Sequence, residues 1–196
     1  GEVIPFKKSI PWLHSLMIKL SPYDFDYTLD YGTEYTVFNM KTDNETWNFS
    51  TMICYEDAMP YIARNFALND NNHKQIDFLV NISNDGWFVD FENEQISPTS
   101  ELPQHLAVSV FRTVENRLSM LRCVNTGISC LIDSSGRIKN SYLAGNLPEK
   151  VIKRQAVAGW FADNVPIDKR ETFYSKYGRW FDLICAVMLA GFFLTP

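Results

Sequence analysis

The stretch TMICYEDAMP, residues 51–60, places a cysteine directly before a phenol and two carboxylic acids. Cys54 could act as a nucleophile, because the thiolate form of cysteine attacks electrophilic carbon readily. Glu56 and Asp57 follow it in the chain, however, and negative charge beside a thiol raises its pKa. A catalytic Cys54 therefore needs an activating cation from elsewhere in the protein, whereas a structural Cys54 needs none.

The segments on either side of Cys54 predict a turn that would present its side chain. Residues 47–54 alternate loosely and then become apolar, which is typical of a strand entering a core. Residues 57–68 predict a helix with Pro60 in its first turn, where proline is tolerated. Such a strand-to-helix elbow lifts a nucleophile out of the sheet and offers backbone N–H groups to an oxyanion. Cysteines at strand ends also serve structural roles, so position alone leaves both interpretations open.

Strands and helices alternate along the rest of the chain, which predicts a layered α/β domain. Residues 76–83 form an apolar run typical of a buried strand. Residues 101–120 predict an amphipathic helix, because apolar residues recur at every fourth position from Leu106 to Leu118. The other expected elements are a short helix (9–20), a strand (33–40), a turn (43–46), a polar loop (69–75), a turn with exposed aromatics (84–88), an acidic loop (89–101), a hairpin (127–143) and a strand (150–158).

Composition limits the classes of function. The chain has 196 residues, of which 46% are apolar, so it can bury a sizeable core. Its net charge of −5 and pI of about 5.2 argue against a nucleic-acid partner, which normally requires a basic face. The cysteines and histidines show no metal-ligand spacing, and we expect no metal site. A disulfide between Cys123 and Cys130 remains an open alternative.

The C-terminal sequence indicates contact with a membrane. No charged residue lies between Leu183 and Leu194, but a transmembrane helix requires about 20 apolar residues. The run is therefore either a buried helix or the beginning of a membrane span. The flank favours the span, because it combines the aromatic and basic residues that gather at membrane interfaces: Tyr177, Arg179, Trp180 and Phe181.

Four short motifs, in this order along the chain, carry a resemblance to a known family. They are CYED (54–57), VNISNDGWF (80–88), FRTVENR (111–117) and RCVNTGIS (122–129). Together they resemble the carbon–nitrogen hydrolase (nitrilase) superfamily. The Cys-Tyr-Glu and Ser-Asn-Asp-Gly-Trp-Phe variants, with an apolar segment after them, resemble its membrane-bound branch, which adds the third acyl chain to bacterial lipoproteins. The opening GEVIP is similar to the Pro-Phe-Gly-Glu segment of the family, so the resemblance spans nearly the whole chain.

The resemblance implies an αββα nitrilase-like sandwich followed by the start of a transmembrane helix. Residues 1–168 would be the C-terminal part of a carbon–nitrogen hydrolase domain and residues 169–182 a juxtamembrane linker. Residues 183–196 would be the truncated start of the C-terminal transmembrane helix. The chain, which does not begin with Met, is thus interpreted as a fragment of a larger membrane protein.

The resemblance also implies a Glu–Lys–Cys triad. Cys54 matches the nucleophile, and Glu2 matches a glutamate that supports the triad. The triad lysine and the base glutamate would lie upstream of Gly1, so the 196 residues alone are expected to be inactive. That lysine would supply the cation that Cys54 requires. Tyr55 and Glu56 match active-site residues beside the nucleophile; the alternative is that they simply form a turn.

The loop after the 76–83 strand is the predicted substrate-binding segment, because α/β sites are built where strands end. Asn84 and Asp85 either contact substrate or cap the turn. Trp87 and Phe88 either contact an acyl chain or pack against the domain.

Other residues of the motifs receive lesser roles. Val89 stands where the family usually has glycine, so residues 89–97 are expected to differ in shape, which leaves recognition of the acceptor or lipid head group open. Arg112, Glu115 and Arg117 are expected to form structural ion pairs, and His105 ranks below them as a candidate for a role in catalysis. A turn at the rim of the site is expected at Asn125, Thr126 and Gly127.

The reaction that the resemblance implies is acyl transfer in two steps. A phospholipid would acylate Cys54 as a thioester, and the α-amine of a diacylglyceryl-cysteine lipoprotein would then accept the acyl chain. No metal or organic cofactor is implied. The expected location is the bacterial cytoplasmic membrane, with the catalytic domain on its periplasmic or outer side. The alternatives are a soluble nitrilase-type amidase and an inactive fragment that serves as a binding or structural module.

Overall fold

The computed structural model describes residues 7, 9–20, 32–92 and 95–194, which fall into two compact units with a boundary between Glu34 and Tyr35. The first unit contains helix α1 (Pro11–Leu20), which confirms the short helix predicted for residues 9–20. The elements described below all belong to the second unit.

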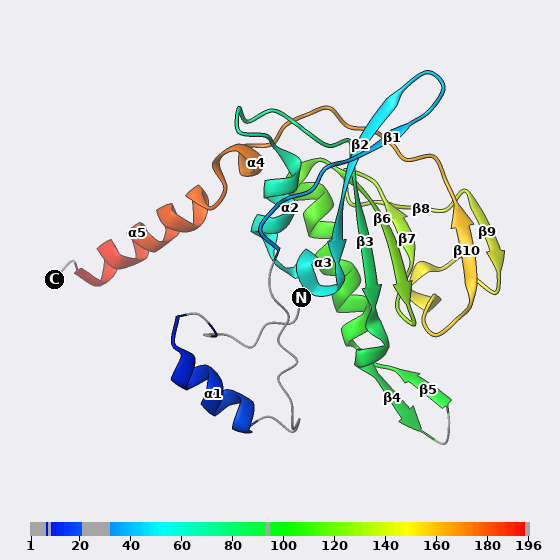
Figure 1. Ribbon diagram of the computed structural model, residues 1–196, viewed down its shortest axis with the longest axis horizontal. Coiled ribbons are helices and arrows are strands. Elements are labelled where there is room, and N and C mark those ends of the chain that lie inside the picture. Colours follow the sequence, from blue (N-terminus) through cyan, green and yellow to red (C-terminus); the bar gives the residue numbers. More distant parts are fainter. Residues whose placement is uncertain (1–6, 8, 21–31, 93–94, 195–196) are drawn as a thin grey trace. The chain divides into compact units, whose positions relative to one another are not determined.

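A mixed six-stranded sheet forms the centre of the second unit (Figure 1). Strands β2, β3 and β6 run parallel to one another, and the outer strands join them antiparallel. Parallel strands end at the same edge of a sheet, so the loops after these three strands begin close together. The strand order is β1 (Phe38–Lys41), β2 (Thr46–Ile53), β3 (Phe78–Asn84), β6 (Ser119–Asn125), β7 (Cys130–Ile132) and β8 (Ile138–Lys139).

Helical segments connect the parallel strands. β2 leads through the 3-10 helix η1 (Cys54–Ala58) into α2 (Pro60–Ala67). β3 leads through η2 (Asp85–Phe88) and the hairpin of β4 (Val89–Glu92) and β5 (Gln95–Pro98) into α3 (Glu101–Asn116). The remaining elements are the paired strands β9 (Tyr142–Gly145) and β10 (Gly159–Ala162), η3 (Val151–Lys153), α4 (Phe173–Tyr177) and α5 (Trp180–Leu194).

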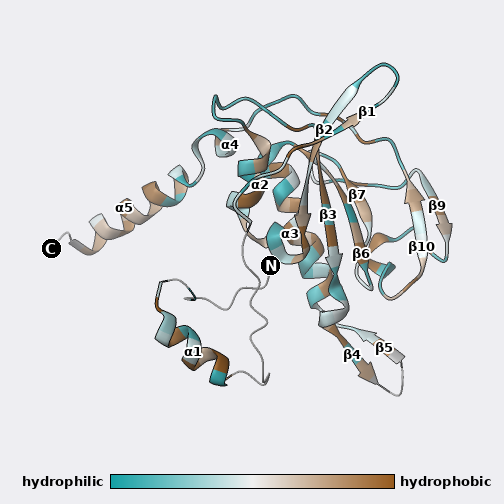
Figure 2. Cartoon of the chain, in the orientation of Figure 1, coloured by the Kyte–Doolittle hydropathy of each residue, from teal (hydrophilic) through white to brown (hydrophobic). Residues whose placement is uncertain are grey.

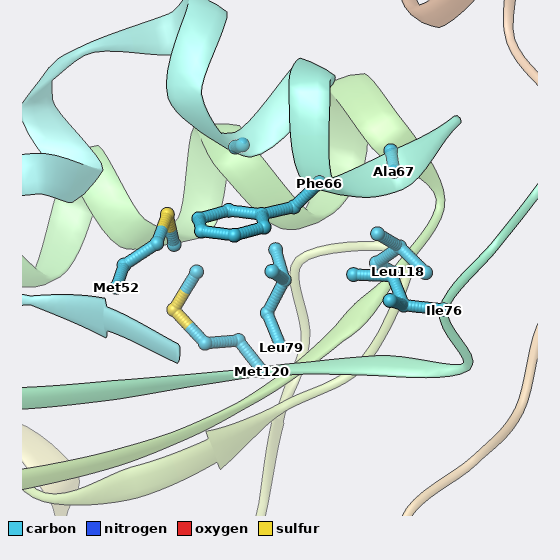
Figure 3. Packing of buried hydrophobic residues seen from close by; sticks show 8 residues of the cluster. Met52, Phe66, Ala67, Ile76, Leu79, Leu118 and Met120 are labelled. Carbon is cyan, nitrogen blue, oxygen red and sulfur yellow. The ribbon is translucent and has the colours of Figure 1, made fainter. Parts of the chain in front are cut away.

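Alternate residues of the parallel strands face the helices and form the core. Met52, Asn81 and Arg122 are partners in register across β2, β3 and β6 on this face. β3 is brown, hence hydrophobic, over its first residues and paler where its polar residues lie (Figure 2). Figure 3 shows the apolar cluster between α2 and the sheet, which consists of Met52, Ala63, Phe66, Ala67, Ile76, Leu79, Leu118 and Met120.

The opposite face of the sheet carries an exposed apolar row. Ile53, Ile82 and Cys123 are partners in register, one position further along each strand, and Ile53 and Ile82 are 60% and 53% exposed. The predicted mixed α/β class is therefore confirmed, and the described residues provide one α layer and one β layer of the predicted αββα sandwich. In such a sandwich the second β layer would lie against this exposed row.

The prediction of an acidic loop at residues 89–101 is wrong. Val89 pairs with Pro98 and Phe91 with Ile96, which makes a β-hairpin that leaves Phe91 72% exposed. Apolar residues alternate with acids in this segment, and that alternation is the pattern of a two-stranded ribbon rather than of an irregular loop.

Two further predictions differ from the structure, one in the end of a helix and one in the type of element. The helix predicted for residues 101–120 ends at Asn116, because Arg117 adopts a left-handed backbone (φ +51°) and the next residues form β6. The strand predicted for residues 150–158 is instead the short helix η3 followed by a turn. The 2%-exposed Arg154 draws this turn inward by donating to the carbonyls of Pro148 and Ser129.

Packing beneath α3 can be tested with one pair of variants on the same helix. Leu106 is 6% exposed in a cluster with Ile128, Cys130 and Ile132, whereas Phe111 is 63% exposed. We expect Leu106→Ala to lower the free energy of unfolding by about 2–5 kcal/mol, because a cavity remains. Phe111→Ala should change it by about 0.5 kcal/mol or less. Urea denaturation of both variants measures the difference, and equal losses would contradict this packing.

Candidate active site around Cys54

Cys54 lies at the turn between β2 and α2, as the sequence predicts, and its backbone is strained. Its φ angle is +52°, in the left-handed region that residues other than glycine rarely adopt. Asn81 donates to the Cys54 carbonyl at 3.1 Å, which fixes the elbow to β3. Such strain costs about 1–3 kcal/mol and persists where the surrounding structure imposes it, often at functional sites. The half-buried Cys54 therefore has the geometry of an elbow nucleophile.

The two residues after Cys54 are held by specific hydrogen bonds. Glu56 accepts a hydrogen bond from a backbone N–H at the end of β2, at 2.7 Å. Tyr55 donates its hydroxyl to Glu101 at 2.6 Å, and its ring centroid lies 4.9 Å from that of His105. The hydrogen bond to Glu101, together with burial, raises the pKa of Tyr55 to about 12, so the phenol stays neutral. Tyr55 thus connects the elbow to the start of α3.

Behind the elbow lies a buried group of four charged residues, which we call the charge cluster: Asp57, Asp85, His105 and Arg122. His105 places Nε2 2.9 Å from an oxygen of Asp57 and Nδ1 3.0 Å from an oxygen of Asp85. Arg122 donates to the other oxygen of each carboxylate, at 3.1 Å in both cases. The charge cluster therefore closes a ring through η1, η2, α3 and β6.

Neutral polar side chains join the charge cluster to the elbow. Arg122 donates to Asn81 at 2.7 Å, and Asn81 in turn holds the Cys54 carbonyl. One amide side chain therefore connects the buried charges with the candidate nucleophile. Two serine hydroxyls add further hydrogen bonds to the carboxylates, Ser109 to Asp57 at 2.5 Å and Ser83 to Asp85 at 2.6 Å.

The electrostatics of the charge cluster favour a protonated His105. Burial alone would lower the His105 pKa, but hydrogen bonds to Asp57 and Asp85 outweigh burial and raise it to about 8. Burial alone would raise the Asp85 pKa, but hydrogen bonds from His105 and Ser83 hold it below its usual value. With His105 protonated, two positive and two negative charges balance inside the protein.

The predicted substrate-binding residues on and before η2 have different surroundings. Asn84 is exposed and its side-chain oxygen caps the turn by accepting from the Gly86 N–H at 3.2 Å. Asp85 is fully buried in the charge cluster. Trp87 is 67% exposed, and Phe88 is half-buried against the Tyr55 ring. Substrate contact stays a prediction for all four, and Trp87 offers the most accessible side chain.

The chain turns after β6, as predicted, and the position of this rim turn at the edge of an active site stays a prediction. Asn125 donates to Asn84 at 2.8 Å, and Thr126 adopts a left-handed backbone with φ +68°. A Cβ on Gly127 would lie 2.4 Å from a carboxylate oxygen of Asp85, so glycine is the residue that fits this approach. The rim turn is thereby packed directly on the charge cluster.

Sequence reasoning identified the elbow but not the cluster behind it. Arg122 and Asn81 lie within recognised motifs, yet neither was singled out, although a charged or amide residue inside an apolar strand is an available signal. His105 was ranked low as a structural residue. The predicted Arg112–Glu115 ion pair is confirmed at 2.6 Å, whereas Arg117 donates to a backbone carbonyl. Glu2 lies outside the described residues.

The structure also bears on a disulfide, a metal site and a membrane-spanning helix. All four cysteines are free, so the open Cys123–Cys130 alternative does not occur. Within the described ranges, the structure groups no set of His, Cys, Asp and Glu residues that could hold a metal ion. Over the same part of the chain, no helix has the length and apolar character needed to cross a bilayer.

The charge cluster predicts a dependence of stability on pH. The His105 pKa is raised from 6.5 to about 8 on folding, so its stabilising contribution is fully present below pH 6.5 and is lost as pH rises through about 8. The expected loss is about 2 kcal/mol of unfolding free energy. Denaturant titrations at pH 6, 7, 8 and 9 measure it. A His105→Gln variant should lack the loss, and an equal loss in that variant would contradict the assignment.

No protein-family model matches the chain. Curated relatives named apolipoprotein N-acyltransferase include one from Thermotoga maritima (31% identical over 95% of this chain and 32% of the relative) and one from Chlorobaculum tepidum (31%, over 90% and 28%). Another, from Treponema denticola, is named apolipoprotein N-acyltransferase 2 (28%, over 96% and 32%). The chain spans about a third of the length of these relatives.

Solved structures with a similar arrangement are more distant in sequence. One is a member of branch 10 of the nitrilase superfamily from Saccharomyces cerevisiae, with a TM-score of 0.40 and 20% identity over 57% of this chain and 37% of that one. Another is a carbon-nitrogen hydrolase from Helicobacter pylori, with a TM-score of 0.41 and 15% identity over 57% and 40%. By its sequence, over nearly its whole length, the chain is a relative of the apolipoprotein N-acyltransferases.

Proposed function

We propose that the protein containing these residues is a lipoprotein N-acyltransferase and that Cys54 carries the acyl chain between donor and acceptor. The observation that carries the proposal is the strained elbow, in which a left-handed Cys54 follows a parallel strand and is held by Asn81. The relatives named apolipoprotein N-acyltransferase support the reaction class, because their similarity covers 95% of the chain in the first case.

The first step would acylate the thiol. The Cys54 thiolate attacks the ester carbonyl of a phospholipid, a C–S bond forms, and the C–O bond breaks with release of lysophospholipid. The backbone N–H of Tyr55 is the proposed oxyanion donor within these residues, because it follows the nucleophile on the same turn. The cation that favours the thiolate is proposed to be a lysine outside the 196 residues, as the family resemblance implies.

The second step would transfer the chain to nitrogen. The α-amine of a diacylglyceryl-cysteine lipoprotein attacks the thioester, a C–N bond forms and the C–S bond breaks, so that Cys54 leaves as the thiolate. The proton that the amine loses is proposed to pass to the base glutamate that the family resemblance implies outside the 196 residues. A thioester suits this role because it acylates amines. Trp87 is proposed to contact an acyl chain, since its large apolar side chain is 67% exposed on the turn after β3. No step of this scheme requires a cofactor.

The proposed location is the bacterial cytoplasmic membrane, with the catalytic residues on its outer side. α5 supports membrane contact because its apolar side chains are exposed along its length, including Phe181 at 72%, Met188 at 70% and Phe192 at 75%. Exposed apolar surface of this extent marks contact with lipid or with another protein. The start of a transmembrane helix at residues 183–196 remains a prediction.

The acyl-enzyme provides the first test. The full-length protein, mixed with phospholipid and no acceptor, should carry an acyl group on Cys54 that hydroxylamine releases. Cys54→Ser should carry none, because an alcohol has a far higher pKa than a thiol and a site that stabilises a thiolate has no strong base poised for it. Intact-protein mass spectrometry measures the adduct.

Matched controls are available on the same chain. Cys123→Ser and Cys185→Ser replace exposed cysteines that do not lie at an elbow, so both variants should acylate at the wild-type rate. An adduct that persists in Cys54→Ser, or that maps to another cysteine, would overturn the proposal. Hydrolysis of a small amide without transfer to an amine would favour the amidase instead.

Membrane attachment has its own test. We expect the full-length protein to remain in the membrane pellet after alkaline carbonate extraction, because the α5 side chains would lie in the hydrocarbon region. After site-specific proteolysis before Trp180, the peptide that contains α5 should stay in the pellet. Release of that peptide with the supernatant would count against the membrane assignment.

A further inference from the structure

A buried histidine contacts both segments that carry the proposed active-site residues. His105 lies on α3 with a side chain that is 0% exposed. Its Nε2 reaches Asp57 in η1, the segment that begins with Cys54, and its Nδ1 reaches Asp85 in η2, the segment that contains Trp87. One imidazole therefore spans the gap between the elbow and the turn after β3.

Only the protonated ring can make both contacts as hydrogen bonds. Ionised carboxylates are acceptors without a hydrogen to donate, so each ring nitrogen must carry one. The imidazolium has two N–H groups, whereas neutral imidazole has one and would present a lone pair to the second carboxylate. The number of segments that His105 holds thus depends on its proton.

His105 is a member of the charge cluster with a pKa near neutral pH, at about 8. Hydrogen bonds from His105 and Ser83 hold the Asp85 pKa below its usual value. Tyr55 stays neutral because its pKa is about 12. The charged and titratable groups that face this site come from every neighbouring element. η1 contributes Asp57 and Tyr55, η2 contributes Asp85, and β6 contributes Arg122. On α3 itself, Glu101 accepts a hydrogen bond from Tyr55, and Arg112 donates to the Asp57 carbonyl.

We propose that His105 is a positioning residue for the acyl transfer proposed above, on which this inference rests: its imidazolium holds η1 and η2 in one relative position, so that Cys54 and the Trp87 turn meet the acyl donor together. Loss of the proton removes one of the two hydrogen bonds that His105 makes to these segments. Arg122 still bridges Asp57 and Asp85, so the protein stays folded while the alignment loosens. Misalignment of reacting groups lowers the rate of the chemical step more than it lowers binding.

The acylation half-reaction tests this role without interference from the acceptor amine. The rate of acyl-enzyme formation in the full-length protein, per folded Cys54, is measured between about pH 6 and pH 9.5 at saturating and limiting phospholipid. Wild type should lose about tenfold in the saturated rate as pH rises through about 8, with KM changed less than about twofold. His105→Gln should show the low rate at all pH values, because an amide presents its donor nitrogen to only one of the two carboxylates and does not titrate.

Controls separate positioning from stability and from the proposed function. His73→Gln replaces an exposed histidine and should keep the wild-type profile. A purely structural role would lower the amount of folded protein and leave the pH profile unchanged, so an alkaline decline that survives in His105→Gln overturns the proposal. If wild type and His73→Gln form no acyl-enzyme at any pH, the proposed function fails and this role fails with it.

A second measurement applies if His105→Gln does not fold. Deuterium exchange at the imidazole C2 position, followed by mass spectrometry of the peptide that contains His105, gives the titration of this one histidine in wild type. Its midpoint should coincide with the midpoint of the alkaline decline in acylation. A separation of more than about one pH unit between the two would overturn the positioning role.

Discussion

The ion pairs of Arg122 are the interaction on which the site depends. One buried guanidinium donates to Asp57, Asp85 and Asn81, which belong to the elbow, to the turn after β3 and to β3 itself. Removal of one partner from a buried ion pair typically costs about 3–5 kcal/mol, because an unpaired charge remains in the interior. The position of Cys54 is thus set by charges that never reach the surface rather than by the apolar core alone.

Sequence patterns predicted the elements whose apolar residues are concentrated in one short segment. The segments 47–54 and 76–83 became β2 and β3, because both are rich in apolar and β-branched residues, although burial alternates along each strand. β6 was missed, since it follows a helix and contains Arg122, and a pattern treats arginine as a surface residue. The hairpin after η2 was missed because each of its strands has only four residues, too few for the alternation to stand out.

The candidate site was predictable to the extent that it is local. Cys54, Tyr55 and Glu56 are consecutive, so strand and helix signals were enough to place them at a turn. The charge cluster is not local: His105 lies 48 residues from Asp57 and 20 residues from Asp85 along the chain. Patterns within a helix cannot show which strands its polar face will meet, so His105 resembled an ordinary polar position.

The backbone at Cys54 also constrains how this site can change during evolution. Glycine and asparagine adopt a left-handed backbone at the lowest energetic cost, so a cysteine at this angle lowers the stability of the turn. Substitutions that relax the turn would make the protein more stable and remove its thiol in the same step. If Cys54 carries the proposed acyl group, a lineage that no longer needs the reaction would gain stability by replacing this residue.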